Sequence, residues 1–377
     1  MATSFVKKTL ALAVLGALGG MAYAQSSVQL YGIVDAAIRH TTNEGADKSG
    51  VTRMIGGGMS QSRWGINVTE DLGGGLSAIA NLENRFLTDS GSGASSNYFQ
   101  QSWVGLRSKS FGQITMGRQY NMLFDLVTST YSSFPYSPYM EAYKPEIGMS
   151  MGARADNMLK YVAEFGPVRG ALQYSFDEKN TGANFSPTNA AMKTAGGYLR
   201  YSQSGISAGL GYLGTTLPMG TKVDAWTLGG SYRTGGLYFN LGYAQNKRKD
   251  VKGATDIAVL TSMWQGTAGV YAAANGAFSA GDANKREMFK IGVGYQITPQ
   301  VNAGVHYFHA KQSGSASGAY NGKADFVVAV VDYAFSKRTD AYFGVDHTKV
   351  SGGSKMFVDG NGATKRTGIT VGLRHRF

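Results

Sequence analysis

The last eleven residues of the chain, TGITVGLRHRF (367–377), alternate between two kinds of side chain. Successive side chains of a β-strand point to opposite sides of the strand. One face of this stretch therefore carries Ile369, Val371 and Leu373 and ends on Phe377, while the other face carries arginines. The stretch predicts a strand that has one apolar face and one charged face.

The same alternation recurs along the chain and is its strongest structural signal. It is found, for example, in SRWGINVTEDL (62–72), VRGALQYSFD (168–177), LYFNLGYAQN (237–246) and FKIGVGYQI (289–297). The chain also has 53 glycines, 22 tyrosines and only seven prolines, and it lacks a Pro/Ser-rich linker that would mark a domain boundary. These features predict one domain of many strands.

Two architectures produce this pattern: a β-sandwich, whose apolar faces point inward, and a membrane β-barrel, whose apolar faces point outward to lipid. The connections favour the barrel, because short turns such as 108–112 and 203–205 alternate with long loops such as 120–153 and 247–284. Short turns on one side and long loops on the other are typical of outer-membrane barrels. Counting the segments predicts a 16-stranded antiparallel transmembrane β-barrel, closed by pairing of the last strand with VQLYGIVDAAIRH (28–40).

The N-terminus has the features of a signal peptide. Residues 1–24 contain two lysines, a short apolar run and the small-x-small sequence Ala22-Tyr23-Ala24. The apolar run is shorter than the roughly 20 residues of a membrane-spanning helix. Cleavage would leave a barrel domain of residues 25–377 and would lower the formal charge from +12 to +10, since it removes Lys7 and Lys8 and no acidic residue. We expect the exported chain in the outer membrane of a Gram-negative bacterium.

Composition and motifs exclude several classes of function. The absence of cysteine excludes a disulfide framework and thiol chemistry. A basic exported protein can bind nucleic acid, lipopolysaccharide or other anions, but the sequence shows no zinc-finger spacing, Walker loop or basic helix, so no nucleic-acid partner is predicted. The glycine-rich IGGGMS (55–60) does not precede a helical pattern, and no G-x-S-x-G motif occurs. We therefore predict no catalytic residue, no cofactor and no metal site.

The predicted barrel has a consequence for function. Side chains cannot fill the interior of a barrel of about 16 strands, which becomes an aqueous channel. A water-filled hole across a membrane conducts solutes. The sequence therefore predicts a passive channel for ions and small hydrophilic solutes.

Several stretches, taken in order, resemble the trimeric general porins of Gram-negative outer membranes, especially their β-proteobacterial branch. They are SSVQLYGIVDAAI (26–38), SRWGINVTEDLGGGLSAIANLE (62–83), WVGLRSKSFGQITMGRQY (103–120), SKRTDAY (336–342) and VGLRHRF (371–377). The resemblance implies a homotrimer of 16-stranded barrels in contact with outer-membrane lipids and lipopolysaccharide. It also implies that the third extracellular loop, about 120–153, folds inward, and that Phe377 is part of the signal read by the outer-membrane assembly machinery.

In such porins an arginine cluster on the barrel wall faces carboxylates on the third loop, and the charge balance sets the ion preference. Gln100 and Ile33 stand where enteric members have basic residues, so the cluster is expected to be thinner here. With a basic wall and a positive mature chain, we predict a weak anion preference. The expected lumen residues are Arg63, Arg85 and Arg154 on the basic wall, Glu83, Asp125, Glu141 and Glu146 as acidic residues, and Gln100, Arg118 and Lys160 elsewhere.

Three alternatives remain open at this point. A substrate-specific channel for sugars or organic anions would need a ladder of aromatic side chains, and the third loop carries Tyr131, Phe134, Tyr136, Tyr139 and Tyr143. A barrel enzyme such as a lipase or protease would need a serine and one of the five histidines. A secreted β-sandwich adhesin would be soluble without detergent.

Overall fold

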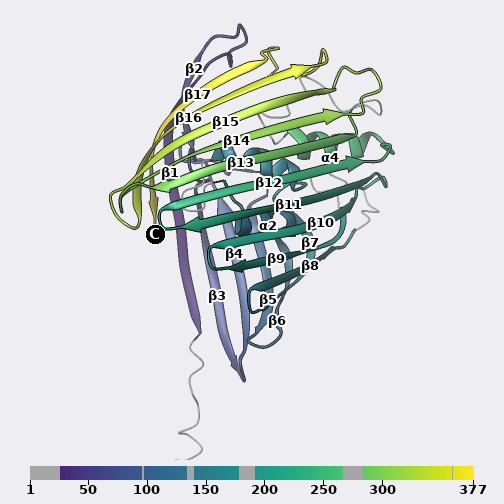
Figure 1. Cartoon of the computed structure of the whole chain (residues 1–377). Helices are drawn as coiled ribbons and strands as arrows, with labels where there is room; N and C mark the ends of the chain where they lie inside the picture. Colours follow the sequence, from purple (N-terminus) through teal and green to yellow (C-terminus); the bar gives the residue numbers. More distant parts are fainter. Residues whose placement is uncertain (1–25, 96, 134–139, 178–191, 266–282, 359) are drawn as a thin grey trace, which may run out of the picture.

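The computed structural model describes residues 26–377 except 96, 134–139, 178–191, 266–282 and 359. Its strands form one continuous antiparallel sheet in which neighbours in sequence are neighbours in space (Figure 1). The strands are β1 (Ser27–Thr41), β2 (Val51–Gly56), β3 (Arg63–Gly73), β4 (Leu76–Arg85), β5 (Phe99–Ser108), β6 (Gly112–Tyr120), β7 (Arg154–Phe165), β8 (Val168–Ser175), β9 (Lys193–Gln203), β10 (Ile206–Thr216), β11 (Lys222–Thr234), β12 (Leu237–Arg248), β13 (Lys285–Gln296), β14 (Val301–Ser313), β15 (Gly322–Ala334), β16 (Thr339–Gly352) and β17 (Lys365–Arg376).

The described strands make a barrel of 16 rather than 17. Both β2 and β3 pair with the same side of β1: residues 51–56 pair with 36–41, and residues 63–69 pair with 27–33. They are therefore two halves of one barrel strand, interrupted at residues 57–62. The predicted 16-stranded antiparallel barrel is confirmed.

The last strand closes the barrel, as predicted. β17 pairs with β1 from Ile33–Arg376 to Thr41–Gly368, and Phe377 and Gly32 exchange two backbone hydrogen bonds of 3.0 and 3.1 Å. The Phe377 ring covers Gly32, where a Cβ atom would lie 2.2 Å from the ring. Closure leaves no strand edge in the hydrocarbon, where unpaired backbone groups are costly.

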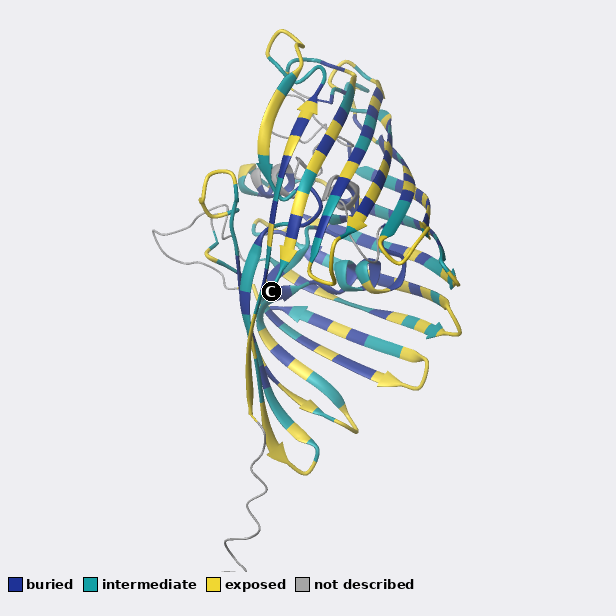
Figure 2. Ribbon diagram, turned by 90° about the vertical axis from the view of Figure 1, so that its left-hand side faces the viewer, coloured by how far each residue is buried: buried dark blue, intermediate teal, exposed yellow. Residues whose placement is uncertain are grey.

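Most strands point an apolar face outward, and Figure 2 shows the resulting alternation of exposed and buried bands along the strands. On β15 the inner face is apolar too, since Phe326, Val328 and Val330 are buried. Leu172 is 62% exposed and Leu199 66% exposed, although both are large apolar residues at the centres of strands. Such a surface is unfavourable in water and matches a lipid environment. Among the described residues, no helix is long and apolar enough to cross a membrane.

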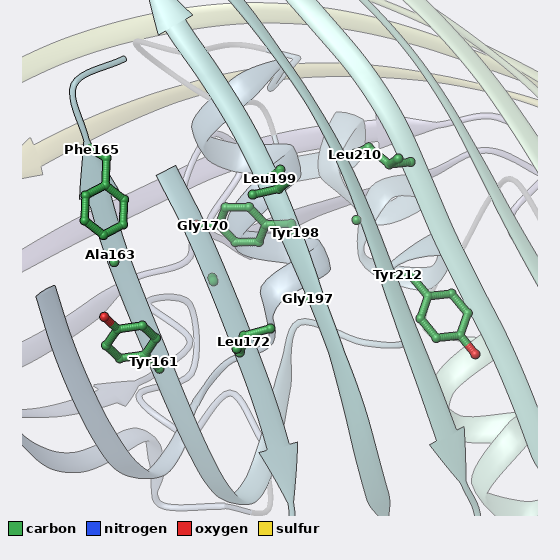
Figure 3. Close-up of a pocket in the computed structure, with 12 residues that line it drawn as sticks. Tyr161, Ala163, Phe165, Gly170, Leu172, Gly197, Tyr198, Leu199, Leu210 and Tyr212 are labelled. Carbon is green, nitrogen blue, oxygen red and sulfur yellow. The ribbon is translucent and has the colours of Figure 1, made fainter. Parts of the chain in front are cut away.

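One groove crosses the outer surface over β7–β10 (Figure 3). Gly170 and Gly197 lack side chains there, and Leu172, Leu199 and Tyr212 flank the depression. Because these flanking side chains are outward and exposed, the groove lies on the lipid-facing surface.

The third long loop folds into the barrel, as predicted. It contains the helices α2 (Met122–Thr130) and α3 (Met140–Met149), and α2 packs against β8–β11 from the inside. The Asn121 side chain caps α2 by accepting a 3.0 Å hydrogen bond from the Phe124 amide. A further helix, α4 (Ala254–Gln265), lies in the loop after β12.

Candidate pore constriction

Three arginines from different strands gather on one wall of the lumen. Arg63 of β3, Arg85 of β4 and Arg154 of β7, which we call the arginine cluster, surround the carboxylate of Glu83 on β4. Arg85 Nε lies 2.9 Å from the Glu83 carboxylate, Arg63 Nη1 lies 3.6 Å away and Arg154 Nη2 lies 3.8 Å away. The structure therefore brings together all four of the wall residues expected from the sequence.

Two tyrosines complete the cluster. The Tyr120 hydroxyl accepts hydrogen bonds from Arg85 and, at 3.1 Å, from Arg154, whose guanidinium also lies 4.6 Å from the centre of the Tyr120 ring. The Tyr31 hydroxyl donates to Glu83 at 3.3 Å. The Tyr120 contacts hold the Arg85 and Arg154 guanidinium groups in place, because a ring face and a hydroxyl oxygen both attract a cation. Sequence reasoning missed both tyrosines, since nothing in the sequence distinguishes them from the other 20 tyrosines of the chain.

The arginine cluster and Glu83 together carry a net positive charge. Three guanidinium groups stand against one carboxylate, so that two positive charges remain. Charges in a narrow, low-dielectric channel act over a longer range than charges in bulk water. This wall can attract anions into the lumen.

The third loop lies against a different part of the wall. The inward positions of β10–β12 carry Gly209, Gly211, Gly229 and Gly242, which we call the glycine platform. Leu126 of α2 lies so close to Gly209 that a Cβ atom there would be 2.5 Å from it, and the Tyr131 ring would be 2.6 Å from a Cβ at Gly229. The absence of side chains on this wall lets the loop pack directly on the backbone.

Polar contacts fasten the loop to the same wall. The Tyr131 and Thr227 hydroxyls are hydrogen-bonded, and the Tyr238 hydroxyl donates to the Ser132 carbonyl at 2.8 Å. Lys290 of β13 donates to the Tyr131 carbonyl and forms an ion pair with Glu146 of α3. The loop is thus held by both its helices.

The described acidic residues of the loop are paired away from the arginine cluster. Glu146 is 1% exposed, contacts Lys290 and accepts a 3.1 Å hydrogen bond from Ser133. Burial raises the pKa of the Glu146 carboxyl, and the neighbouring Lys290 ammonium opposes that rise. Asp125 lies 2.7 Å from Lys160. The expectation that Glu146 faces the arginines is wrong, because Lys290 competes for the same carboxylate.

Comparison with known proteins shows the family to which this barrel belongs. The family described as Gram-negative porin matches residues 11–353 of the chain. The chain belongs to this family. It is 35% identical to outer membrane porin protein 32 of Delftia acidovorans over 61% of the chain and 66% of that protein. It is 28% identical to an outer membrane porin protein of Bordetella pertussis over 99% of the chain and the whole of that protein.

A solved structure, titled an anion-selective porin from Comamonas acidovorans, superposes with a TM-score of 0.73 at 26% identity, over 94% of the chain and all of that protein. The chain is therefore a general diffusion porin of the Gram-negative outer membrane, a passive channel for ions and small hydrophilic solutes. The arginine cluster and the inward loop are parts of this channel.

Two of the porin's expected lumen residues have other partners in the structure, and both lie near register shifts between neighbouring strands. A register shift on β5 makes Gln101 the partner of Glu83, and Gln100 donates instead to the Asn97 carbonyl at 2.9 Å. Arg118 has the same parity as the outward Met116 and pairs with Asp156, next to a bulge at Gly117–Gln119. Lys160, in contrast, is buried on the inner side, where it donates to the Tyr120 carbonyl at 2.9 Å.

The loop aromatics give little support to a sugar ladder. Tyr131 is 2% exposed and packs on the glycine platform, so that it offers no free ring face to a passing sugar. Phe134, Tyr136 and Tyr139, and the side chains of Tyr143 and Glu141, lie outside the described residues. Within the described ranges, no three His, Asp or Glu side chains lie close enough together to hold a metal ion.

Proposed function

We propose that this porin is weakly anion-selective and that the arginine cluster sets the preference. The observation that carries the proposal is the charge balance around Glu83, where Arg63, Arg85 and Arg154 outnumber one carboxylate. The printed description of the Comamonas acidovorans structure as anion-selective agrees with it.

The pairing of the loop carboxylates strengthens the proposal. A carboxylate that faced the arginines would lower the positive potential at the constriction and would attract cations. Asp125 and Glu146 instead form ion pairs with Lys160 and Lys290. The described part of the loop therefore adds little negative charge to the path of the ions.

Recordings from the refolded protein in planar bilayers under a salt gradient test the proposal. We expect open channels with a reversal potential of anion sign. A reversal potential of cation sign would remove the proposed preference and leave the channel function intact.

We also infer that the barrel has no hydrolytic activity. His309 Nδ1 lies 2.7 Å from Asp325 Oδ1, which is the spacing of the His–Asp part of a catalytic triad. Both side chains lie on the outward face, however, and the hydroxyl that shares Asp325 is that of Tyr307. Esterase and protease assays should give no activity above background, and an activity lost in His309→Ala would contradict this inference.

We further propose that the porin is a homotrimer that associates through the outer face of β1–β6. Outward tyrosines such as Tyr161, Tyr212 and Tyr295 occur on β7–β17, whereas the tyrosines within strands β1–β6, Tyr31 and Tyr120, contact the arginine cluster inside. Outward tyrosines are typical of a surface that meets the lipid interface. Native mass spectrometry in detergent should give the mass of three chains, and a monomer alone would contradict the proposal.

A further inference from the structure

Residues 57–62, which we call the inserted segment, interrupt one strand of the barrel. β2 ends at Gly56, opposite Ala36 of β1, and β3 begins at Arg63, opposite Ile33. Six residues of the inserted segment therefore stand opposite two residues of β1, and four more than the ladder can pair must leave the sheet. Because hydrocarbon offers backbone groups no hydrogen bonds, the lumen is the favourable side.

The inserted segment lies on the inner face of β1, β16 and β17. A Cβ atom at Gly58 would be 2.4 Å from the Tyr342 hydroxyl of β16. Tyr342 points inward, since the next residue, Phe343, is exposed on the outer face. From β17, Arg374 donates a 2.7 Å hydrogen bond to the Ser60 hydroxyl. The inserted segment therefore occupies space inside the barrel.

The buried carboxylate of Asp35 on β1 holds the inserted segment. One oxygen, Oδ2, accepts hydrogen bonds from the Met59 and Ser60 amides at 3.1 and 2.7 Å. The other oxygen, Oδ1, accepts from the Gly58 amide at 3.1 Å and from the Tyr342 hydroxyl at 2.6 Å. Hydrogen bonds to an ionised acceptor are stronger than those between neutral groups. Asp35 thus binds three consecutive amides of the inserted segment.

The far end of the inserted segment contacts the arginine cluster. Arg63 Nε donates to the Gln61 carbonyl at 3.0 Å, which is shorter than the 3.6 Å between Arg63 Nη1 and the Glu83 carboxylate. The Ser62 hydroxyl donates to the Asp35 carbonyl at 3.1 Å and accepts from the Asp35 amide at 2.9 Å. The position of Arg63 therefore depends on how the inserted segment is held on β1.

The inserted segment and the third loop lie on opposite sides of the lumen. When β2 and β3 count as one of the 16 barrel strands, β10 is eight strands away from β1, which is half way around the ring. The third loop packs through α2 on β8–β11, whereas the inserted segment packs on β1, β16 and β17. Two inward segments thus border the lumen, and the arginine cluster lies on the wall between them.

We propose that the inserted segment is a second constriction element of this channel and that Asp35 is its positioning residue, which holds Arg63 at the pore. Asp35 is 0% exposed, so it acts through the inserted segment and not by contact with the ions. The role in positioning Arg63 rests on the proposed anion preference. The narrowing of the lumen by the inserted segment does not depend on that preference.

Reversal potentials in a salt gradient test the positioning role. Asp35→Asn replaces one acceptor oxygen by an amide group, which cannot accept from a backbone N–H. The matched control, Asp346→Asn, removes another buried inward carboxylate, which pairs with Arg39 and is remote from the inserted segment. Loss of a negative charge alone makes the lumen more positive, so the control should keep or increase the anion preference.

Asp35→Asn should have the opposite effect, because a loosened inserted segment no longer holds Arg63. We expect its reversal potential to shift toward zero relative to the wild type. No shift, or a shift in the direction of the control, would overturn the positioning role. Open channels in both variants show that the barrels have folded.

A thiol at position 59 tests the role of Asp35 independently of ion preference. The chain has no cysteine, so Met59→Cys introduces a single thiol, and residue 59 is 0% exposed. A charged methanethiosulfonate reagent should leave the current of Met59→Cys unchanged and reduce that of Asp35→Asn/Met59→Cys. Equal reaction in the two backgrounds would contradict the role of Asp35, whatever the ion preference of the wild type.

Deletion of residues 57–60 tests the constriction itself. It leaves two residues opposite the two of β1, so β2 and β3 can join in one strand with unchanged parity. Single-channel conductance should rise above that of the wild type, because the inserted segment no longer narrows the lumen. An unchanged or smaller conductance would overturn this part of the proposal. If the deletion prevents folding, the thiol measurement still decides whether Asp35 holds the inserted segment.

Discussion

Two sides of the lumen have the same alternation of inward and outward residues but carry different inward residues. The inward positions of β3, β4 and β7 present Arg63, Arg85 and Arg154 around one carboxylate. The inward positions of β10–β12 present the glycine platform, on which the third loop packs. One wall supplies charge and the other supplies space: the third loop packs on the second wall, and we propose that the charges of the first wall set the ion preference. The experiments below alter one wall at a time.

The largest effect on selectivity is expected from removing the arginine cluster. A variant with Arg63→Ser, Arg85→Ser, Arg154→Ser and Glu83→Gln removes the three guanidinium groups without leaving Glu83 as an uncompensated buried charge. The anion preference should disappear, and the reversal potential in a salt gradient should move to zero or to cation sign. An unchanged reversal potential would show that charges elsewhere select the ions.

Breaking the pair that fastens the loop should give the largest loss of stability. Lys290→Met leaves Glu146 buried without its cation, and the loss of one partner from a buried pair costs about 3–5 kcal/mol. We expect a lower thermal midpoint in detergent and flickering conductance as the loop loosens. The double variant Lys290→Met/Glu146→Gln should recover most of the stability, and a double variant as unstable as the single one would contradict the pairing.

A side chain on the glycine platform should displace the loop. Gly229→Leu would overlap the Tyr131 ring, and overpacking of this kind costs about 1–3 kcal/mol. The conductance should change while the sign of selectivity stays the same, because the arginine cluster is untouched. Gly294→Val is the control, since Gly294 is also inward and a Cβ there has its nearest neighbour at 3.7 Å. Equal effects of the two substitutions would argue against packing of the loop on Gly229.

The smallest effect is expected at Tyr120. Tyr120→Phe keeps the ring beneath Arg154 and removes the hydroxyl that accepts from Arg85 and Arg154. Hydrogen bonds to charged groups contribute about 1.5–3 kcal/mol, but Glu83 still holds both arginines. A slightly weaker anion preference is expected in the reversal potential, with unchanged conductance. A complete loss of selectivity would mean that Tyr120, rather than Glu83, positions the cluster.

The sequence by itself determined the barrel, its closure and the direction of most side chains. These properties follow from the parity of residues along each strand, which is local, so that the outward Leu172 and the inward Arg63 are both readable from their neighbours. Gln100 and Arg118 were expected in the lumen, although they have the same parity as Val104 and Met116, which point outward. Arg118 follows this parity in the structure, where it pairs with Asp156, so that the alternation along β6 was a better guide there than the resemblance.

Only the tertiary structure decided which charges meet. Glu146 pairs with a lysine 144 positions away, and Tyr120 lies between arginines of two different strands. The inward glycines of β10–β12, which the sequence does not distinguish from the other glycines of the chain, form the surface on which α2 and Tyr131 pack. Such contacts depend on how the loop folds back into the barrel. The alternation along a strand determines whether a side chain points inward, but it does not determine which residue lies opposite across the lumen.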